Sequence, residues 1–278
     1  MSLPLLSARL GKRQAALEYK WMKRATSPIP LDQMLARRVA GEPLQYILAE
    51  QPFGPLTIKT RPPVLIPRPE TEHWTIRLAE LLHPTATPAR PLSVLDLGTG
   101  TGCIPLLLCH LLPAGSVRAY GVDISPDAVN LAAENAALCG LSAPADPSRN
   151  SFQPIQASFL DPNFPHLNLG VAPPFDLITS NPPYISWPEY VRLPPSVSHY
   201  EDPKALFGGP DGLDFYHAIA ALVARNDFLN PGAVVVVEVG DGQADSVQRI
   251  FKATAQMNTE IWLDPWKKMR TVIARPGI

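Results

Sequence analysis

The tetrapeptide Asn181-Pro182-Pro183-Tyr184 combines residue types that can bind a flat group carrying nitrogen. Proline fixes φ and has no N–H, so two prolines in succession produce a rigid turn that is rich in hydrogen-bond acceptors. The Asn181 side chain and the Pro182 carbonyl could accept hydrogens from an NH₂ group, and the Tyr184 ring could stack on a planar group. The pattern therefore predicts a turn that orients an amide or amine nitrogen, with an ordinary proline turn as the alternative.

A glycine-rich loop lies upstream of this tetrapeptide. The residues Asp96-Leu97-Gly98-Thr99-Gly100-Thr101-Gly102 follow an apolar run, and Pro105 can occupy the first turn of the helix expected after them. Glycine lets the backbone approach a flat ligand and adopt a positive φ, and a helix amino terminus attracts a carboxylate. Nucleotide sites, dinucleotide sites and plain tight turns share such loops, so the loop alone does not identify the ligand.

The spacing around this loop separates these ligand classes in part. A dinucleotide pattern would place its third glycine, or an alanine, at position 103, where this chain has Cys103. Asp123 ends the next predicted strand about twenty residues further on, where an acid can bind the ribose hydroxyls of an adenosine or a dinucleotide. We therefore expect Asp123 to bind a ribose, with a simple turn carboxylate as the alternative.

Strand and helix patterns alternate from residue 93 onward and predict the scaffold that positions these motifs. The β-type runs are residues 93–97, 117–122, 155–156, 175–179 and 233–239. Such alternation predicts an α/β fold with a parallel sheet covered by helices on both faces. Ligands bind such sheets at the carboxyl edge of the strands, where the glycine loop, Asp123 and Asn181 would all lie.

Smaller elements are predicted before residue 93. Residues 30–40 have a helical pattern that ends at Gly41, and residues 70–82 also have a helical pattern. Between them, alternation over residues 45–60 indicates a β-hairpin. We expect a small helical amino-terminal domain over residues 1–42, a β-hairpin linker over residues 43–66 and the large domain over residues 67–278.

Composition restricts the classes of function. A net charge of −1 argues against broad electrostatic binding of DNA or RNA, which requires clustered Lys and Arg. The cysteines have no Cys-x-x-Cys spacing and the histidines no His-x-x-x-His spacing, so no metal site is expected. The longest apolar run, near residues 104–112, is too short to cross a bilayer, and no integral membrane protein is expected.

The first 24 residues are basic, and two interpretations are open. Six Lys or Arg residues accompany a single acid, Glu18, with serines and leucines between them. This composition is typical of a mitochondrial targeting segment, and it also suits a solvated basic helix of a small amino-terminal domain. We expect a location in the mitochondrial matrix, with the cytoplasm as the alternative.

Several sequence strings resemble known proteins. DLGTGTG from residue 96, GVDIS from residue 121 and NPPY from residue 181 resemble a class I methyltransferase that modifies exocyclic or amide nitrogens. Further strings resemble the HemK/PrmC family, the glutamine methyltransferases of peptide-chain release factors. These are PLQYI from residue 43, LIPRPETE from 65, ALFGG from 205, DGL from 211 and EVG from 238 with Gln243. The likeness extends from about Gly41 to Arg275.

This resemblance implies a Rossmann-like class I fold with a seven-stranded, mostly parallel sheet and helices on both faces. It implies transfer of a methyl group from S-adenosyl-L-methionine to the glutamine side-chain nitrogen in the Gly-Gly-Gln motif of a class I release factor, in support of translation termination. The small amino-terminal domain would dock that substrate. We expect a eukaryotic, mitochondrial, fungal-like member that is a monomer, with no stable nucleic-acid partner and no membrane association.

The resemblance also implies roles for individual residues. Asn181, Pro182, Pro183 and Tyr184 would bind the glutamine, and Asn181, Pro182 and Tyr184 among them would be catalytic. The cofactor-binding residues would be Asp96, Gly98, Thr99, Gly100, Thr101, Gly102, Asp123, Phe159 and Asn181.

The chain departs from the family pattern in three places, and two other functions remain open. The amino-terminal domain is shorter than in bacterial members, Phe159 stands where tryptophan is common, and Trp266-Lys267-Lys268 replaces a usual glycine before Arg270. A nucleic-acid methyltransferase could hold a flipped base with the same tetrapeptide, although the near-neutral charge argues against it. A non-catalytic binding module could retain the fold, although a scaffold has no need for Asp123 and Asn181.

Overall fold

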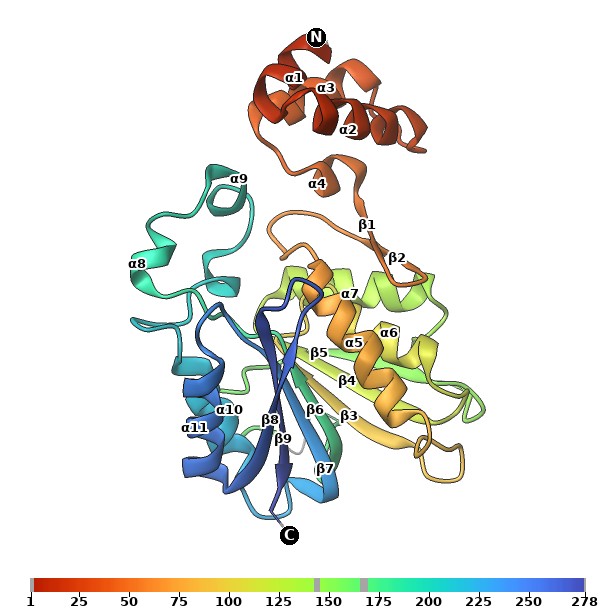
Figure 1. Cartoon of the computed structure of the whole chain (residues 1–278). Coiled ribbons are helices and arrows are strands. Elements are labelled where there is room, and N and C mark those ends of the chain that lie inside the picture. Colours follow the sequence, from red (N-terminus) through yellow and green to blue (C-terminus); the bar gives the residue numbers. More distant parts are fainter. Residues whose placement is uncertain (1–2, 143–145, 166–169, 278) are drawn as a thin grey trace.

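The computed structural model describes residues 3–142, 146–165 and 170–277. Figure 1 shows a small helical body at the amino terminus, a β-hairpin below it and a larger body in which helices flank a twisted sheet. Within these described ranges, no helix is both long enough and apolar enough to cross a membrane.

Four helices with apolar residues on one side form the small body. They are α1 (Leu3–Leu10), α2 (Lys12–Arg24), α3 (Leu31–Ala40) and α4 (Leu44–Leu48). Their buried side chains form a separate hydrophobic cluster, the amino-terminal cluster, made of Leu6, Ala15, Met22, Met34, Leu35, Leu44 and Ile47. Glu18 is buried on α2, and its carboxylate accepts a hydrogen bond of 2.6 Å from Arg38 Nε on α3. The predicted helix over residues 30–40 is confirmed, and Gly41 ends it with φ 110°.

The predicted hairpin is confirmed over only part of residues 45–60. Strands β1 (Glu50–Phe53) and β2 (Leu56–Lys59) pair antiparallel, and Leu56 and Ile58 point into the core while Thr57 and Lys59 remain exposed. Residues 44–48 form helix α4 instead, because Leu44 and Ile47 pack into the amino-terminal cluster at helical spacing. Tertiary burial therefore overrides the local alternation.

A seven-stranded sheet forms the centre of the large body. Its order is β5-β4-β3-β6-β7-β9-β8, with the first five strands parallel and β9 antiparallel to both of its neighbours. The strands are β3 (Leu92–Leu97), β4 (Val117–Asp123), β5 (Ser151–Gln156), β6 (Phe175–Ser180), β7 (Leu229–Glu238), β8 (Met257–Leu263) and β9 (Met269–Pro276). This arrangement confirms the predicted fold class.

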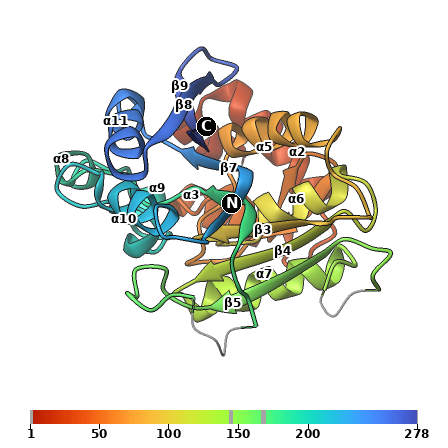
Figure 2. The same ribbon diagram turned by 90° about the horizontal axis from the view of Figure 1, so that it is seen from below.

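Helices cover both faces of the sheet, as Figure 2 shows from below. Strand residues alternate between two hydrophobic clusters, so that Val94 packs into the first and its neighbour Leu95 into the second. The first cluster includes residues of α5 (Pro69–Leu82), α6 (Cys103–Leu111) and α7 (Pro126–Leu138). The second includes residues of α10 (Asp214–Val223) and α11 (Ala244–Ala255).

The chain reverses direction across the sheet at β3. Strand β4 lies on one side of β3 and β6 on the other, so the loops that follow these three strands meet at the carboxyl edge. Residues 187–207, the roof segment, follow β6 and contain α8 (Trp187–Tyr190), α9 (Pro195–Ser198) and the short helix η2 (Pro203–Ala205). An Arg68–Glu201 ion pair of 2.6 Å and a hydrogen bond from Asp202 N to Pro63 O tie this segment to the stretch before α5.

Candidate active site

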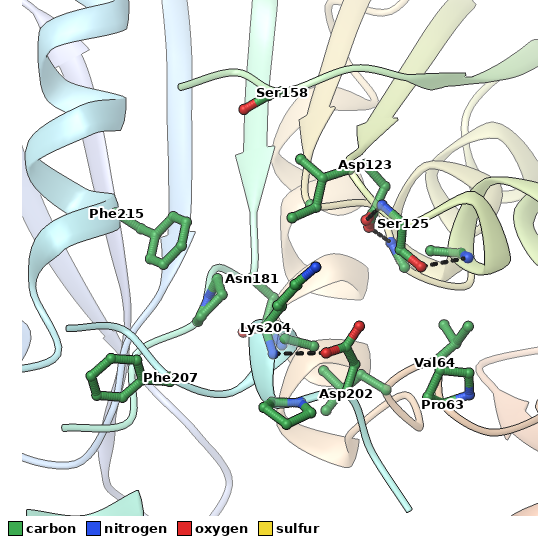
Figure 3. A pocket seen from close by; sticks show the side chains of 18 of the residues that line it. Pro63, Val64, Asp123, Ser125, Ser158, Asn181, Asp202, Lys204, Phe207 and Phe215 are labelled. Atoms are coloured by element: carbon green, nitrogen blue, oxygen red, sulfur yellow. Dashed lines mark hydrogen bonds between the residues drawn. The ribbon is translucent and has the colours of Figure 1, made fainter. Parts of the chain in front are cut away.

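A cavity of about 460 Å³ opens at the carboxyl edge of the sheet, between the strand loops and the roof segment. Figure 3 shows Asp123 and Ser125 on one side of it, Phe207 and Phe215 on the other, and Asn181 between them. The lining comes from the loops after β3, β4, β5 and β6, which the sequence places far apart. The predicted site residues in the lining are Gly98, Gly100, Asp123, Phe159, Asn181 and Pro183.

Two glycines of the loop after β3 present open backbone to this cavity. Gly98 and Gly100 have φ values of 71° and 55°, and among the described residues no atom lies within 4 Å of a Cβ placed on either one. Gly102 has a different role, because a Cβ there would lie 2.8 Å from the Phe152 ring. The loop therefore needs glycine at Gly98 and Gly100 for conformation and ligand approach, and at Gly102 for packing.

The other predicted residues of this loop lie behind it. Asp96, Thr99 and Thr101 are buried and lie outside the lining of the cavity. Thr179 Oγ1 donates a hydrogen bond of 2.7 Å to Asp96 Oδ1. The structure thus places these three residues as supports of the loop, and their contact with a cofactor stays a prediction.

Asn135 holds the loop in place, a role that sequence reasoning missed. Its buried side chain donates to Thr101 O at 3.0 Å and accepts from Lys59 N at 2.8 Å, which connects α7, the glycine loop and β2. The sequence carries no signal for this role beyond a polar residue on the buried face of an amphipathic helix.

Asp123 is held by backbone donors at the end of β4. Its Oδ2 accepts from Gly100 N and its Oδ1 from Ser125 N, both at 2.9 Å. Burial raises the pKa of the Asp123 carboxyl, and these backbone hydrogen bonds oppose the rise. Ser125 Oγ accepts from Ala128 N and so caps the start of α7. Each carboxylate oxygen keeps a lone pair for a further donor.

Adjacent residues of the Asn181–Tyr184 turn line two different cavities. Asn181 and Pro183 line the first cavity, whereas Pro182 is buried. Tyr184 lines a second cavity of about 360 Å³, together with Asp211, Gly240 and Gln243. The turn therefore separates the two cavities, and Tyr184 lies outside the lining of the one that contains the glycine loop.

Gln243 and two glycines fix the backbone of this turn. Gln243 Nε2 donates to Tyr184 O at 2.9 Å, and Gln243 Oε1 accepts from Gly240 N at 2.9 Å. A Cβ at Gly212 would overlap Tyr184 O, and one at Gly208 would lie 2.6 Å from Pro183 O. The strings DGL, ALFGG and EVG with Gln243 therefore surround the tetrapeptide in space.

The roof segment contributes lining residues that sequence reasoning did not identify. Lys204 extends into the cavity between the two walls, and Asp202 lies beside it (Figure 3). Phe207 forms an aromatic cluster with Trp187 and Tyr190, whose ring centroids lie 5.8 and 5.7 Å from its own. Only the string ALFGG pointed to this region. Over the described residues, no three His, Cys, Asp or Glu side chains gather as a metal site would require.

The chain is similar to several known methyltransferases. A family model described as a methyltransferase domain matches residues 90–262. A release factor glutamine methyltransferase of Geobacter sulfurreducens is 38% identical over 276 residues, covering 98% of this chain and 88% of the relative. One from Moorella thermoacetica is 37% identical, covering 82% and 72%. The crystal structure of a release-factor-specific protein-(glutamine-N5) methyltransferase from Alicyclobacillus acidocaldarius is 26% identical with a TM-score of 0.43, covering 77% of this chain and 95% of that one.

The sheet is mostly parallel, and the glycine loop and Asp123 lie at its carboxyl edge, where the chain reverses direction. Together with the matching family model, these features define a class I methyltransferase, an enzyme that uses S-adenosyl-L-methionine. Identity of 38% across nearly the whole chain is decisive for the subgroup. The chain belongs to the HemK/PrmC family of release factor glutamine methyltransferases.

The residues present fit this cofactor. Gly98 and Gly100 leave room for a ligand to lie against the backbone, and Asp123 keeps lone pairs that ribose hydroxyls can use. Phe159 lines the same cavity and offers an apolar ring for an adenine, in the place where tryptophan is common in the family. We therefore expect Gly98, Gly100, Asp123 and Phe159 to hold the cofactor.

The Asp123→Ala variant should bind the cofactor about tenfold to a hundredfold more weakly, because it loses hydrogen bonds to a charged acceptor. Titration calorimetry with S-adenosylhomocysteine measures this change. Asp127→Ala is the matched control, since it removes an exposed carboxylate from the first turn of α7, outside the cavity lining. Equal affinity of the Asp123 variant and the wild type would rule out this role.

In the cofactor-free protein, the Asp96→Asn variant should be more stable than the wild type, and this difference should grow as pH rises. Burial raises the pKa of Asp96 from 3.8 to about 7, and the hydrogen bond from Thr179 opposes the rise. Folding therefore favours the protonated form, and ionisation removes stability as pH rises from about 4 through 7. The free energy of unfolding of the variant should exceed that of the wild type increasingly over this range, by up to about 4 kcal/mol. Urea unfolding at pH 5 and pH 8 tests this, and a difference independent of pH would contradict it.

Proposed function

We propose that this enzyme methylates the side-chain amide nitrogen of the glutamine in the Gly-Gly-Gln motif of a class I peptide-chain release factor. The observation that carries the proposal is the placement of Asn181 and Pro183 in the cavity that also contains Gly98, Gly100 and Asp123. A nitrogen group bound by the rigid turn would thus lie beside the bound cofactor. The names of the relatives support the choice of a release factor glutamine as the substrate.

The turn would activate a poor nucleophile. An amide nitrogen is weakly nucleophilic because its lone pair is delocalised into the carbonyl group. The Asn181 side-chain oxygen and the Pro182 carbonyl would each accept one amide hydrogen, which increases the electron density on nitrogen and fixes its direction. S-adenosyl-L-methionine would supply the electrophilic methyl group there and leave as S-adenosylhomocysteine, and the methylated nitrogen would release one amide proton. Tyr184 would cover the amide plane and exclude water.

The two cavities suggest how the substrate enters. Tyr184 and Gln243 line the second cavity, and Pro183, beside Tyr184 in the chain, lines the first. A glutamine side chain inserted into the second cavity would meet Tyr184, and it would reach Asn181 only after Tyr184 moved aside, because the turn separates the two cavities. The protein substrate would then stay outside while the cofactor occupies the first cavity.

Methyl-transfer assays test this function directly. The enzyme is incubated with methyl-labelled S-adenosyl-L-methionine and candidate release factors, and mass spectrometry maps the modified residue. The expected result is one methyl group on the Gly-Gly-Gln glutamine, and no label when that glutamine is replaced by alanine. Label on another residue, or on nucleic acid in place of the release factor, would reject the proposal.

A location in the mitochondrial matrix of a eukaryotic, fungal-like organism is a further part of the proposal. The basic composition of residues 1–24 supports it. Import of the labelled chain into isolated mitochondria tests the location, and retention of the chain in the cytoplasm of intact cells would contradict it.

We also propose a monomer that forms no stable complex with nucleic acid or membrane. The net charge of −1 supports the absence of a stable nucleic-acid complex. Residues 1–42 would dock the release factor, residues 43–66 would link this small domain to the large one, and residues 67–278 would catalyse methyl transfer. The separate amino-terminal cluster supports a docking body, although Leu44 and Ile47 extend it past residue 42. Light scattering and gel shift measurements test the monomer and the absence of nucleic acid.

A further inference from the structure

A chain of buried hydrogen bonds ends at the side chain of Asn181. Asn181 Nδ2 donates to Thr71 Oγ1 at 3.2 Å, and Thr71 Oγ1 donates to Glu238 Oε2 at 2.6 Å. Trp74 Nε1 donates to the same oxygen of Glu238 at 2.9 Å. Thr71, Trp74 and Glu238 are at most 2% exposed, and all three lie outside the lining of both cavities. The chain connects α5, the end of β7 and the turn after β6.

Proton counting gives the direction of these bonds for an ionised Glu238. The indole N–H of Trp74 can only donate, so Glu238 Oε2 acts as an acceptor. Burial raises the pKa of the Glu238 carboxyl, and the hydrogen bonds from Thr71 and Trp74 oppose that rise. When Glu238 is ionised, it can only accept, so Thr71 gives it the one hydroxyl proton and the Thr71 oxygen accepts from Asn181. The NH₂ end of the Asn181 amide must therefore face Thr71.

The opposite end of that amide is left available. Within the described part of the chain, no hydrogen bond occupies Asn181 Oδ1, and Asn181 lines the cofactor cavity. The terminal torsion of asparagine is broad and roughly two-fold, so an unconstrained amide could also present its NH₂ group to the cavity. That orientation would place a donor against the substrate amide hydrogens, where an acceptor is needed.

We propose that Thr71 and Glu238 are positioning residues that set the orientation of the Asn181 amide, so that its oxygen meets the substrate nitrogen. The change in turnover that this inference predicts rests on the proposed function. It assigns no contact with substrate or cofactor to either residue. Thr71 acts through its hydroxyl group, and Glu238 acts by directing that hydroxyl proton away from Asn181.

The Thr71→Val variant tests the inference, because it removes the hydroxyl and keeps the β-branched shape. We expect kcat to fall by about tenfold to a hundredfold while cofactor affinity stays unchanged. Thr75→Val is the matched control, since Thr75 lies one turn later in α5, is also buried, and donates its hydroxyl to Thr71 O. That variant should keep wild-type kcat. Thr71→Ser restores the hydroxyl and should recover kcat to within about threefold.

Two outcomes of these assays would overturn the inference. One is a wild-type kcat for Thr71→Val, and the other is an equal loss for Thr75→Val, which would indicate a merely structural role. If the valine variant does not fold, Thr71→Ala and Thr75→Ala provide the same comparison, with thermal unfolding of both recorded.

A substrate-free measurement separates this inference from the proposed function. In protein labelled with ¹⁵N at asparagine, the Asn181 side-chain amide signal is assigned by its loss in Asn181→Ala. It should shift in Thr71→Val and stay unchanged in Thr75→Val. An unshifted signal in Thr71→Val would contradict the inference even if release factor methylation is found. A shifted signal together with no methylation of any release factor would reject only the proposed function.

Discussion

Replacement of Asn181 with alanine is expected to lower kcat about 10²-fold or more, with little change in cofactor affinity. The variant loses the side-chain oxygen that faces the substrate nitrogen, and one positioned polar contact of this kind contributes on the order of 10²-fold to 10³-fold. The backbone of the turn should persist, because Gln243 still binds Tyr184 O and the two prolines still restrict φ.

Single-turnover assays with saturating cofactor measure the Asn181→Ala effect, and calorimetry measures the affinity for S-adenosylhomocysteine. Asn258→Ala, at an exposed position in β8, serves as the control and should behave as the wild type. Turnover at the wild-type rate by the Asn181 variant would remove the turn from the mechanism.

The second large effect is expected for Gly212→Ala, which should also lose about 10²-fold in kcat. A Cβ at Gly212 would overlap Tyr184 O and lie 2.5 Å from Gln243 Nε2, so the catalytic turn must move. Displacement of reacting groups by about 1 Å can cost this much in rate. The effect would arise at a residue outside the lining of both cavities.

Gly232→Ala is the matched control for this substitution. Gly232 has φ 80° and Gly212 has φ 78°, so an alanine at either position meets the same backbone strain. No described atom lies within 4 Å of a Cβ at Gly232, however, and Gly232 lies outside the lining of both cavities. Both variants should lose similar thermal stability, and only Gly212→Ala should lose activity. Equal kcat values for the two variants would show that the turn tolerates displacement.

The sequence predicts those strands whose apolar runs end in residues with distinct chemistry. Gly98 and Asn181 follow β3 and β6, Asp123 ends β4, and each reaches the cavity because parallel strands present their carboxyl ends together. The apolar pattern does not predict strands β8 and β9 individually. In β8, polar residues such as Asn258 and Glu260 interrupt the apolar pattern, and its partner β9 is antiparallel.

The supporting residues could not be predicted because they depend on contacts distant in sequence. Thr71 and Glu238 are separated by 167 residues, and either side chain alone suggests a helix surface or a strand end. Lys204 enters the cavity only because the roof segment folds back onto Pro63 and Arg68. Local patterns specify which elements form, whereas tertiary packing decides which side chains meet.

The packing of α2 has a consequence for any protease that processes the amino terminus. Excision of residues 1–24 would remove Leu6, Ala15 and Met22 from the small helical body and leave Arg38 without its carboxylate partner. Loss of one member of a buried ion pair alone costs about 3–5 kcal/mol. Cleavage after residue 24 would therefore disrupt the small helical body. A targeting signal within residues 1–24 would have to stay attached to the active enzyme.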